Sequence, residues 1–305
     1  MSSSSSEISS TLLALSNNLA DAVEQAGQCV VAINARSRRS SSGIHWRQGV
    51  IITADETIKR SEDITVTLSN GRTVPATLVG RDPSSDIAVF KLQDVELPVA
   101  QIGDATSLKV GQIVLSVGRS SESGVNASMG VVSAIGDSWR SSYGGLIDQF
   151  LRLDLNLYPS SEGGPLVVAS GHVVGMTVSG PRRTVLAIPA STVNRVVDQL
   201  LAKGRISKGY LGLGMQPVSL PESLKTTLNL SSLGGVIVVN VEPNGPADKA
   251  GVLIGDVLIA VDGTPISDTS EIQAKLGSQS VGETLNVQII RGGALVEVAL
   301  TIGER

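Results

Sequence analysis

The chain has 305 residues, about twice the usual length of a single domain, which favours two domains. Apolar residues make up 41% and charged residues 17%, a mixture that can bury a core and excludes a mostly disordered chain. The net charge of −4 is too small to indicate a nucleic-acid partner, and the single cysteine, Cys29, excludes an intrachain disulfide.

No stretch approaches the roughly 20 consecutive apolar residues that span a bilayer, so no membrane span is expected. The serine-rich start lacks the basic residues that open a signal peptide, and we therefore expect a cytoplasmic protein. Cys29 begins an apolar run, where a small buried side chain is favoured over a reactive thiol.

The first predicted element is an amphipathic helix over residues 7–27, within an N-terminal segment 1–28. Its apolar stripe repeats at spacings of three and four: Ile8, Leu12, Leu15, Leu19, Val23 and Ala26. The stripe fits either packing against the helix's own domain or contact with another subunit.

Residues 29–207 are predicted to form a domain of short antiparallel strands, either barrels or a sandwich. The Asn70-Gly71 pair predicts a tight hairpin, and a helix from Ser191, with Gly204 as its C-cap, closes the domain. The expected strands are Cys29–Asn34, Gly49–Thr53, Asp63–Leu68, Thr73–Val79, Asp86–Leu92, Gln112–Val117, Asn126–Ala134, Asp148–Leu155 and Gly171–Ser179.

Residues 208–305 are predicted to form a smaller α+β domain, with a hairpin turn at Gly292-Gly293. Short helices are expected over 246–250 and 269–276. The expected strands are Tyr210–Gly214, Val236–Val241, Val257–Val261, Thr284–Arg291 and Leu295–Ile302.

Several segments together resemble the HtrA family, in which a trypsin-like serine protease domain precedes one PDZ domain. Residues 162–167 (EGGPLV) are similar to the nucleophile loop, and residues 80–89 (GRDPSSDIAV) to the segment that carries the catalytic aspartate. The PDZ resemblance lies in YLGL at 210–213, VEPNGPA at 241–247 and GDVLI at 255–259. The resemblance implies a mainly β fold: a trypsin/chymotrypsin-like double β-barrel of six strands each, with a cleft between the barrels, followed by a PDZ domain.

Carried over residue by residue, the resemblance implies a degenerate catalytic triad. Glu56 stands where the family has its histidine and Glu162 where it has its serine, whereas Asp86 matches the aspartate. Ser160 replaces a glycine of the oxyanion loop, and Ser161 has no imidazole to take its proton. We therefore expect a protein that is inactive as a serine protease; the alternative is an active HtrA-type endopeptidase, or a carboxylate-dependent variant of one.

The two histidines, His45 and His172, match no catalytic position and are expected to be ordinary surface or turn residues. The run Arg36, Arg38 and Arg39 is expected to be a solvated loop, since a nucleic-acid patch would also need aromatic residues.

Three carboxyl groups in one cleft cannot all ionise without compensation. The sequence leaves three arrangements open: a shared-proton pair that acts on a peptide, a Ca²⁺ or Mg²⁺ site, or glutamates that face solvent or pair with Lys59, Arg60 or Arg47. The last is favoured, and no metal or cofactor is expected.

The PDZ resemblance implies a groove that binds polypeptide C-termini or unfolded protein. The residues expected to form it are Tyr210, Leu211, Gly212, Leu213, Ile272 and Leu276. The alternative is that the leucines belong to the core. The family further implies a homo-oligomer, a trimer or larger, with a chaperone-like, scaffolding or regulatory role.

Overall fold

The computed structural model describes residues 3–36, 39–60, 62–207, 209–230, 234–277 and 280–305. The chain divides into two compact units, Met1–Ile206 and Ser207–Arg305. The segment 1–28, predicted as separate from the strands that follow it, lies in the first unit.

The first unit is built almost entirely of strands, with one helix at each end. The helices are α1 (Ser3–Gly27) and α2 (Ala190–Lys203), and the short 3-10 turns are η1 (Asp55–Thr57), η2 (Ala105–Ser107) and η3 (Pro181–Arg183). The strands are β1 (Val30–Asn34), β2 (Ser41–Arg47), β3 (Val50–Thr53), β4 (Thr65–Thr67), β5 (Thr73–Pro75), β6 (Thr77–Asp82), β7 (Ile87–Lys91), β8 (Ile113–Ser120), β9 (Gly124–Gly136), β10 (Trp139–Arg140), β11 (Leu146–Ile147), β12 (Phe150–Asp154), β13 (Pro165–Val168), β14 (Val173–Ser179) and β15 (Val185–Pro189).

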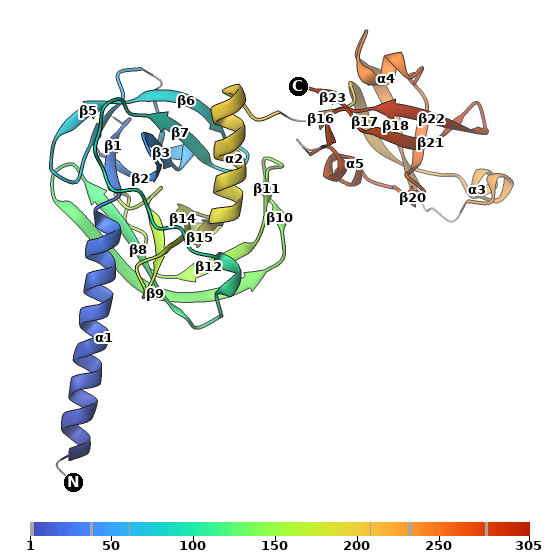
Figure 1. Ribbon diagram of the computed structural model, residues 1–305. Helices are drawn as coiled ribbons and strands as arrows, with labels where there is room; N and C mark the ends of the chain where they lie inside the picture. The colour runs from blue at the N-terminus through green and yellow to red at the C-terminus, as the bar shows by residue number, and fades with distance from the viewer. Residues whose placement is uncertain (1–2, 37–38, 61, 208, 231–233, 278–279) are drawn as a thin grey trace. The chain divides into compact units, whose positions relative to one another are not determined.

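These strands form a half-barrel and a closed barrel, as expected from the trypsin-like resemblance (Figure 1). In the described residues the half-barrel runs in the order β5-β4-β1-β2-β3-β7-β6, and the closed barrel in the order β12-β15-β14-β13-β8-β9. Along β12, Leu151 and Leu153 are buried between more exposed neighbours, the period-two pattern of a strand with one face in the core.

The half-barrel has one strand more than expected because the predicted strand 73–79 is two strands. Pro75 cannot donate a ladder hydrogen bond and ends β5, which lies at an edge of the sheet. The next N–H, of Ala76, donates to Ile64 O (3.0 Å), and the chain resumes as β6 at the opposite edge. The Asn70-Gly71 hairpin is confirmed: β4 pairs antiparallel with β5.

Strand β2 was not predicted, because its serines and glycine lack a strand-like pattern. It lies between β1 and β3 and is buried along nearly its whole length. A Cβ on Gly43 would lie 2.8 Å from Ile33 Cδ1, so only glycine fits here. Its Trp46 is buried and donates through Nε1 to Asn194 Oδ1 (2.8 Å), which fastens α2 to the half-barrel.

Over residues 10–27, whose side chains the structure describes, helix α1 packs on the barrels through its C-terminal half, where Ala22 and Ala26 are buried. Its N-terminal half extends away from them (Figure 1). Cys29 follows the helix, and its burial raises the pKa of the thiol to about 11, so the structure confirms an inert core residue. Among the described residues, no helix is both long and apolar enough to cross a membrane.

Helix α2 ends as predicted. Gly204 adopts the left-handed conformation (φ 70°) and its N–H donates to Leu200 O (2.8 Å). The helix begins one residue before the expected Ser191, with Pro189 as N-cap.

The second unit is a small α+β fold. In its described residues one sheet runs β17-β18-β19-β21-β22, with β20 paired to β19 and a separate pair β16-β23. The elements are β16 (Gly209–Tyr210), β17 (Leu213–Ser219), α3 (Glu222–Leu228), β18 (Gly234–Val241), α4 (Pro246–Lys249), β19 (Val257–Val261), β20 (Thr264–Pro265), α5 (Thr269–Lys275), β21 (Thr284–Arg291), β22 (Ala294–Thr301) and β23 (Gly303–Glu304). The hairpin at Gly292-Gly293 is confirmed, since both glycines have positive φ and β21 pairs antiparallel with β22.

Candidate functional site

The three carboxyl residues singled out by the resemblance come from both barrels and meet in the first unit. Glu56 lies in η1 and Asp86 in the turn before β7, both in the half-barrel; Glu162 lies in the loop before β13 of the closed barrel. The main-chain N–H of Glu56 donates to Asp86 Oδ1 (2.8 Å), and that of Asp55 donates to Asp86 O (3.2 Å). These two hydrogen bonds attach η1 to Asp86. Asp86 itself has a left-handed conformation (φ 56°), which aspartate tolerates better than most residues.

Two glycines let the loop of Glu162 pack closely against β3 of the half-barrel and β8 of the closed barrel. A Cβ on Gly163 would lie 2.4 Å from Thr53 Oγ1, and one on Gly164 would lie 2.2 Å from Val117 O. The loop is closed by the N–H of Ser42, which donates to Glu162 O (2.9 Å). These contacts therefore fix the backbone at Glu162 in place.

The Glu56 and Glu162 side chains hydrogen-bond to each other and share one proton. This bond, together with burial and the nearby Asp86, raises the pKa of Glu56 to about 8. Burial of Glu162 opposes its ionisation, but hydrogen bonds from Glu56, Ser179 and Arg36 outweigh burial and lower its pKa. At neutral pH the pair is a carboxylic acid that donates to a carboxylate.

Asp86 is also hard to ionise. Burial raises its pKa to about 7, although the N–H donated by Glu56 opposes the rise. The cleft thus keeps Glu56 largely protonated near neutral pH, and Asp86 partly so.

The cation beside these carboxyls is Arg36, not the Lys59, Arg60 or Arg47 expected from the sequence. Arg36 Nη2 lies 3.3 Å from Glu162 Oε2, and its Nε donates to Thr57 O (2.9 Å). The expectation of a solvated loop is therefore wrong for Arg36, while Arg38 lies outside the described residues. Of the three cations expected from the sequence, Arg60 donates to Asn34 O and Arg47 pairs with Asp198. Lys59 is the one of the three whose charge affects the carboxyl pair, and it lowers the pKa of Glu56.

The cation-binding arrangement has no support in the structure. Across the described parts of the chain, no group of three or more His, Cys, Asp or Glu side chains is placed to hold a metal ion. The negative charge of the acidic cluster is instead reduced by protonation of Glu56 and balanced by the Arg36 guanidinium.

In the described residues, neither neighbouring serine has its hydroxyl bonded to a base that could activate it as a nucleophile. Ser161 is fully buried, and its Oγ donates to Asn126 Oδ1 (2.5 Å). The carbonyl oxygen of Ser160 accepts from Ser42 Oγ (2.6 Å). Ser160 is not among the described residues with positive φ, so its Cβ causes no strain in this loop.

The histidines do not supply a base. His45 is 1% exposed, so the expectation of a surface residue is wrong for it. Its Nδ1 bonds Pro98 O (2.9 Å) and its Nε2 accepts from Gly49 N–H (2.9 Å), which uses both ring nitrogens. His172 lies exposed in a turn beside Ser170, as predicted.

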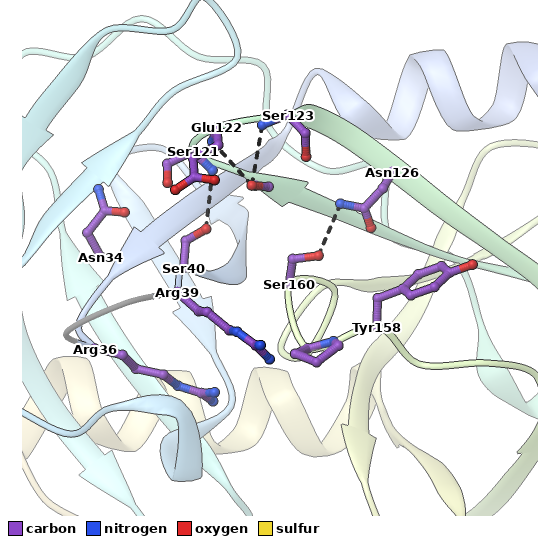
Figure 2. Close-up of a pocket in the computed structure, with 12 residues that line it drawn as sticks. Asn34, Arg36, Arg39, Ser40, Ser121, Glu122, Ser123, Asn126, Tyr158 and Ser160 are labelled. Atoms are coloured by element: carbon purple, nitrogen blue, oxygen red, sulfur yellow. Dashed lines mark hydrogen bonds between the residues drawn. The ribbon is translucent and has the colours of Figure 1, made fainter.

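A cavity of about 630 Å³ opens beside Arg36, the cation that pairs with Glu162 (Figure 2). Its walls come from the segment after β1, the hairpin between β8 and β9, and the loop that contains Ser160. Arg36 links this cavity to the carboxyl pair, because it lines the cavity and pairs with Glu162. The sequence signal for this cavity was the run of arginines at 36, 38 and 39, which we interpreted from the sequence as a solvated loop.

The predicted peptide groove of the second unit lies at an open sheet edge. Strand β17 is the outer strand of its sheet, and α5 contacts it. Gly212 adopts a left-handed conformation (φ 73°) at the start of this edge. The carbonyl oxygens of Leu211 and Gly212 accept N–H bonds from Ala247 (2.9 Å) and Glu242 (2.8 Å), whereas their own N–H groups meet no acceptor within the described residues.

Besides Gly212, the five other residues expected at this groove fall into two groups. Leu211 and Ile272 are buried in the core of the unit, as in the alternative kept open above. Tyr210, Leu213 and Leu276 are partly exposed, and Tyr210 pairs with Gly303.

Comparison with known proteins identifies both units. Residues 41–176 match the family model of the trypsin-like peptidase domain, and residues 209–302 match that of the PDZ domain. Curated relatives include a Pseudomonas fulva protein (33% identical over 264 residues, 84% of this chain and 54% of the relative) and one from Halomonas elongata (32% identical, 89% of this chain and 58% of the relative). The chain thus spans little more than half the length of these relatives, both named "Probable periplasmic serine endoprotease DegP-like".

Solved structures agree with the fold. The serine endoprotease from Yersinia pestis superposes with a TM-score of 0.72 at 29% identity, covering 93% of this chain and 97% of that one. An HtrA-type protease, AlgW, with a bound tripeptide superposes with a TM-score of 0.70 at 28% identity, covering 94% and 97%.

These names correct the expectation of a cytoplasmic protein. That expectation rested on the absence of a recognisable leader, whereas the curated relatives are named periplasmic.

Proposed function

Because the chain belongs to the HtrA-like family of trypsin-like peptidase and PDZ proteins, we propose that it binds polypeptides without serine-type proteolysis. One observation carries this proposal: Glu162, which the family resemblance aligns with the nucleophile, hydrogen-bonds Glu56, which it aligns with the base. Polypeptide C-termini or unfolded protein would bind at the PDZ groove, in a chaperone-like, scaffolding or regulatory role.

The chemistry of the cleft supports inactivity. Acyl transfer to serine needs a hydroxyl nucleophile and a base that takes its proton. The Ser161 hydroxyl donates a hydrogen bond to Asn126 Oδ1, and no imidazole bonds to any hydroxyl of the cleft in the described residues. Loss of one triad member alone lowers the rate by about 10⁴- to 10⁶-fold, and the losses do not add, because the triad acts as a unit.

The PDZ unit supports the binding half of the proposal. The unbonded N–H groups of Leu211 and Gly212 suit a terminal carboxylate, and the open edge of β17 suits an added peptide strand. The residues proposed to form this groove are Tyr210, Leu211, Gly212, Leu213, Ile272 and Leu276.

Gly212→Ala is expected to weaken binding of a peptide with a free C-terminus and an apolar last residue by about tenfold. Alanine resists the left-handed conformation at this position (φ 73°), and its Cβ would meet Glu242 Cβ at 3.3 Å, so the loop would shift. Fluorescence titration of the full chain measures the change.

Gly263→Ala is the matched control. Gly263 has the same φ of 73°, but its Cβ would point into open space and it lies outside the groove. It should cost similar stability and leave binding unchanged. Equal affinity for free and amidated peptides would contradict carboxylate capture.

A working endopeptidase is the second candidate, and the names of the relatives favour it. In that case the Glu56–Glu162 pair, which already shares a proton, would have to activate water and protonate the substrate carbonyl. Cleavage would then be lost in Glu162→Gln, since no carboxylate base would remain in the pair.

We further propose a periplasmic location, supported by the names of the relatives, and assembly into homo-oligomers. Exposed leucines of α1 support assembly: Leu12 and Leu15 of the apolar stripe are 62% and 41% exposed, and the adjacent Leu13 is 62% exposed. Residues 8–20 carry no charge, so two copies of this helix would meet without repulsion.

Leu12→Ser combined with Leu15→Ser is expected to lower the molar mass measured by light scattering, because a smaller apolar area is buried between copies. Ser16→Ala on the same helix is the control. A wild-type chain that is monomeric at all concentrations, or an oligomer unchanged by the double substitution, would contradict a role for α1.

A further inference from the structure

The cavity beside Arg36 is lined mainly by hydrogen-bond donors. Three of its serine hydroxyl oxygens already accept N–H bonds: Ser40 Oγ from Ser121 N (3.2 Å), Ser120 Oγ from Glu122 N (3.2 Å) and Ser123 N (3.4 Å), and Ser160 Oγ from Asn126 Nδ2 (3.3 Å) (Figure 2). A hydroxyl has one proton to donate besides its lone pairs. In the described residues these three protons meet no acceptor, so they remain available to a ligand.

The same contacts make the cavity a formed site. They fix the hairpin between β8 and β9 and the loop of Ser160 in place, so a ligand need not order them. At about 630 Å³ the cavity is large enough for a side chain together with the backbone on either side of it.

Two arginines give the cavity its cationic wall. Arg36 and Arg39 both point into it from the segment after β1 (Figure 2). Arg36 already pairs with Glu162, whereas Arg39 forms no ion pair or hydrogen bond with the described residues. Glu122, in the exposed hairpin turn, lies on the opposite side of the cavity (Figure 2).

We propose that this cavity binds the carboxylate of an aspartate or glutamate side chain in an extended polypeptide, with Arg39 as its cation and Ser40 and Ser160 as hydroxyl donors. A carboxylate accepts such bonds with all of its lone pairs, and bonds to a guanidinium are about twice as strong as neutral ones. The inference rests on the proposed binding of polypeptides and adds a preference for acidic segments in the barrel unit.

The test uses the full chain and two amidated, acetylated decapeptides of Ala, Ser and Gly. One carries two adjacent glutamates at its centre, the other two glutamines, and both bear an uncharged fluorophore. Amidation removes the terminal carboxylate, so capture by the PDZ loop does not contribute. Fluorescence anisotropy is expected to show that the glutamate peptide binds about tenfold more tightly than the glutamine peptide at low salt.

Arg39→Gln should remove most of this difference, and Ser160→Ala part of it, about two- to threefold. Arg72→Gln is the matched control, since it removes the same charge from an exposed turn between β4 and β5 and should change neither affinity. Glu122→Gln should tighten binding of the glutamate peptide, because it removes the opposing charge.

Equal affinity for the two peptides, no measurable binding of the glutamate peptide, or a preference that survives Arg39→Gln would each overturn the proposal. Binding of inorganic phosphate without binding of the glutamate peptide would identify a small-anion site instead, and would overturn it as well. Binding of peptides with free C-termini tests the PDZ groove separately. This binding can persist when the preference for glutamate is absent, and the preference for glutamate can persist when binding at the PDZ groove is absent.

Discussion

The triple variant Glu56→His, Ser160→Gly, Glu162→Ser is expected to cleave unfolded casein, whereas the wild-type chain leaves it intact. The variant replaces the carboxyl pair by an imidazole and a hydroxyl on the same two backbone positions. Asp86 already sits beside residue 56 and binds its N–H (2.8 Å), so it can orient a histidine there. The gain should be of the order of 10⁴-fold or more, the factor by which an intact triad exceeds a broken one.

The variant Ser160→Gly, Glu162→Ser, which keeps Glu56, is the matched control for this gain. It has the hydroxyl and the oxyanion-loop glycine but no base, and should remain inactive. Arg36 loses its ion pair in both variants but keeps its bond to Thr57 O, so a difference between them reports the histidine. Equal cleavage by the wild-type chain and the triple variant between about pH 4 and pH 9 would refute the inactive cleft and support the carboxyl-dependent endopeptidase.

The free energy of unfolding of the barrel unit is expected to fall as the pH rises from about 5 to about 8. The folded chain holds protons on Glu56 and Asp86, whose pKa values are raised to about 8 and about 7. The unfolded chain releases both protons at lower pH. Below about pH 5 the proton uptake therefore favours the folded state fully, and this stabilisation is lost as the pH rises to about 8. The lowered pKa of Glu162 acts only in more acidic solution, where its protonation removes stability.

Solvent screening at the exposed Glu56 side chain limits the change to about 1–2 kcal/mol, or about 5 °C in the melting temperature of this unit. Glu56→Gln should reduce the pH dependence to the part that Asp86 contributes, because an amide donates to Glu162 without titrating. Glu96→Gln, which removes an exposed carboxyl elsewhere in the unit, should leave the dependence unchanged. A wild-type chain that becomes more stable between about pH 5 and pH 8 would contradict the shared proton.

The strands with strong turn signals could be predicted from the sequence, and those without could not. Asn70-Gly71 and Gly292-Gly293 mark hairpins because Gly71, Gly292 and Gly293 adopt the positive φ that favours glycine. Strand β2 escaped prediction because its place in the sheet depends on tertiary packing: Gly43 is needed where Ile33 approaches, not by any local pattern. The double β-barrel and the PDZ unit followed from the family resemblance, which also identified the three acidic positions.

The electrostatics of the site depend on contacts that no local pattern reveals. Arg36 reaches Glu162 over 126 positions of sequence separation, so the chain offered three nearer cations as candidates and all three were wrong as ion-pair partners. Burial of His45 likewise follows from its bonds to Pro98 and Gly49 across the half-barrel.

A fluorophosphonate probe on the purified wild-type chain, followed by peptide mass spectrometry, tests most directly whether any hydroxyl of the cleft is activated. We expect no covalent adduct on any serine, Ser161 included, because its proton is committed to Asn126 and no imidazole adjoins it. An adduct mapped to a serine of the barrel unit would contradict the account.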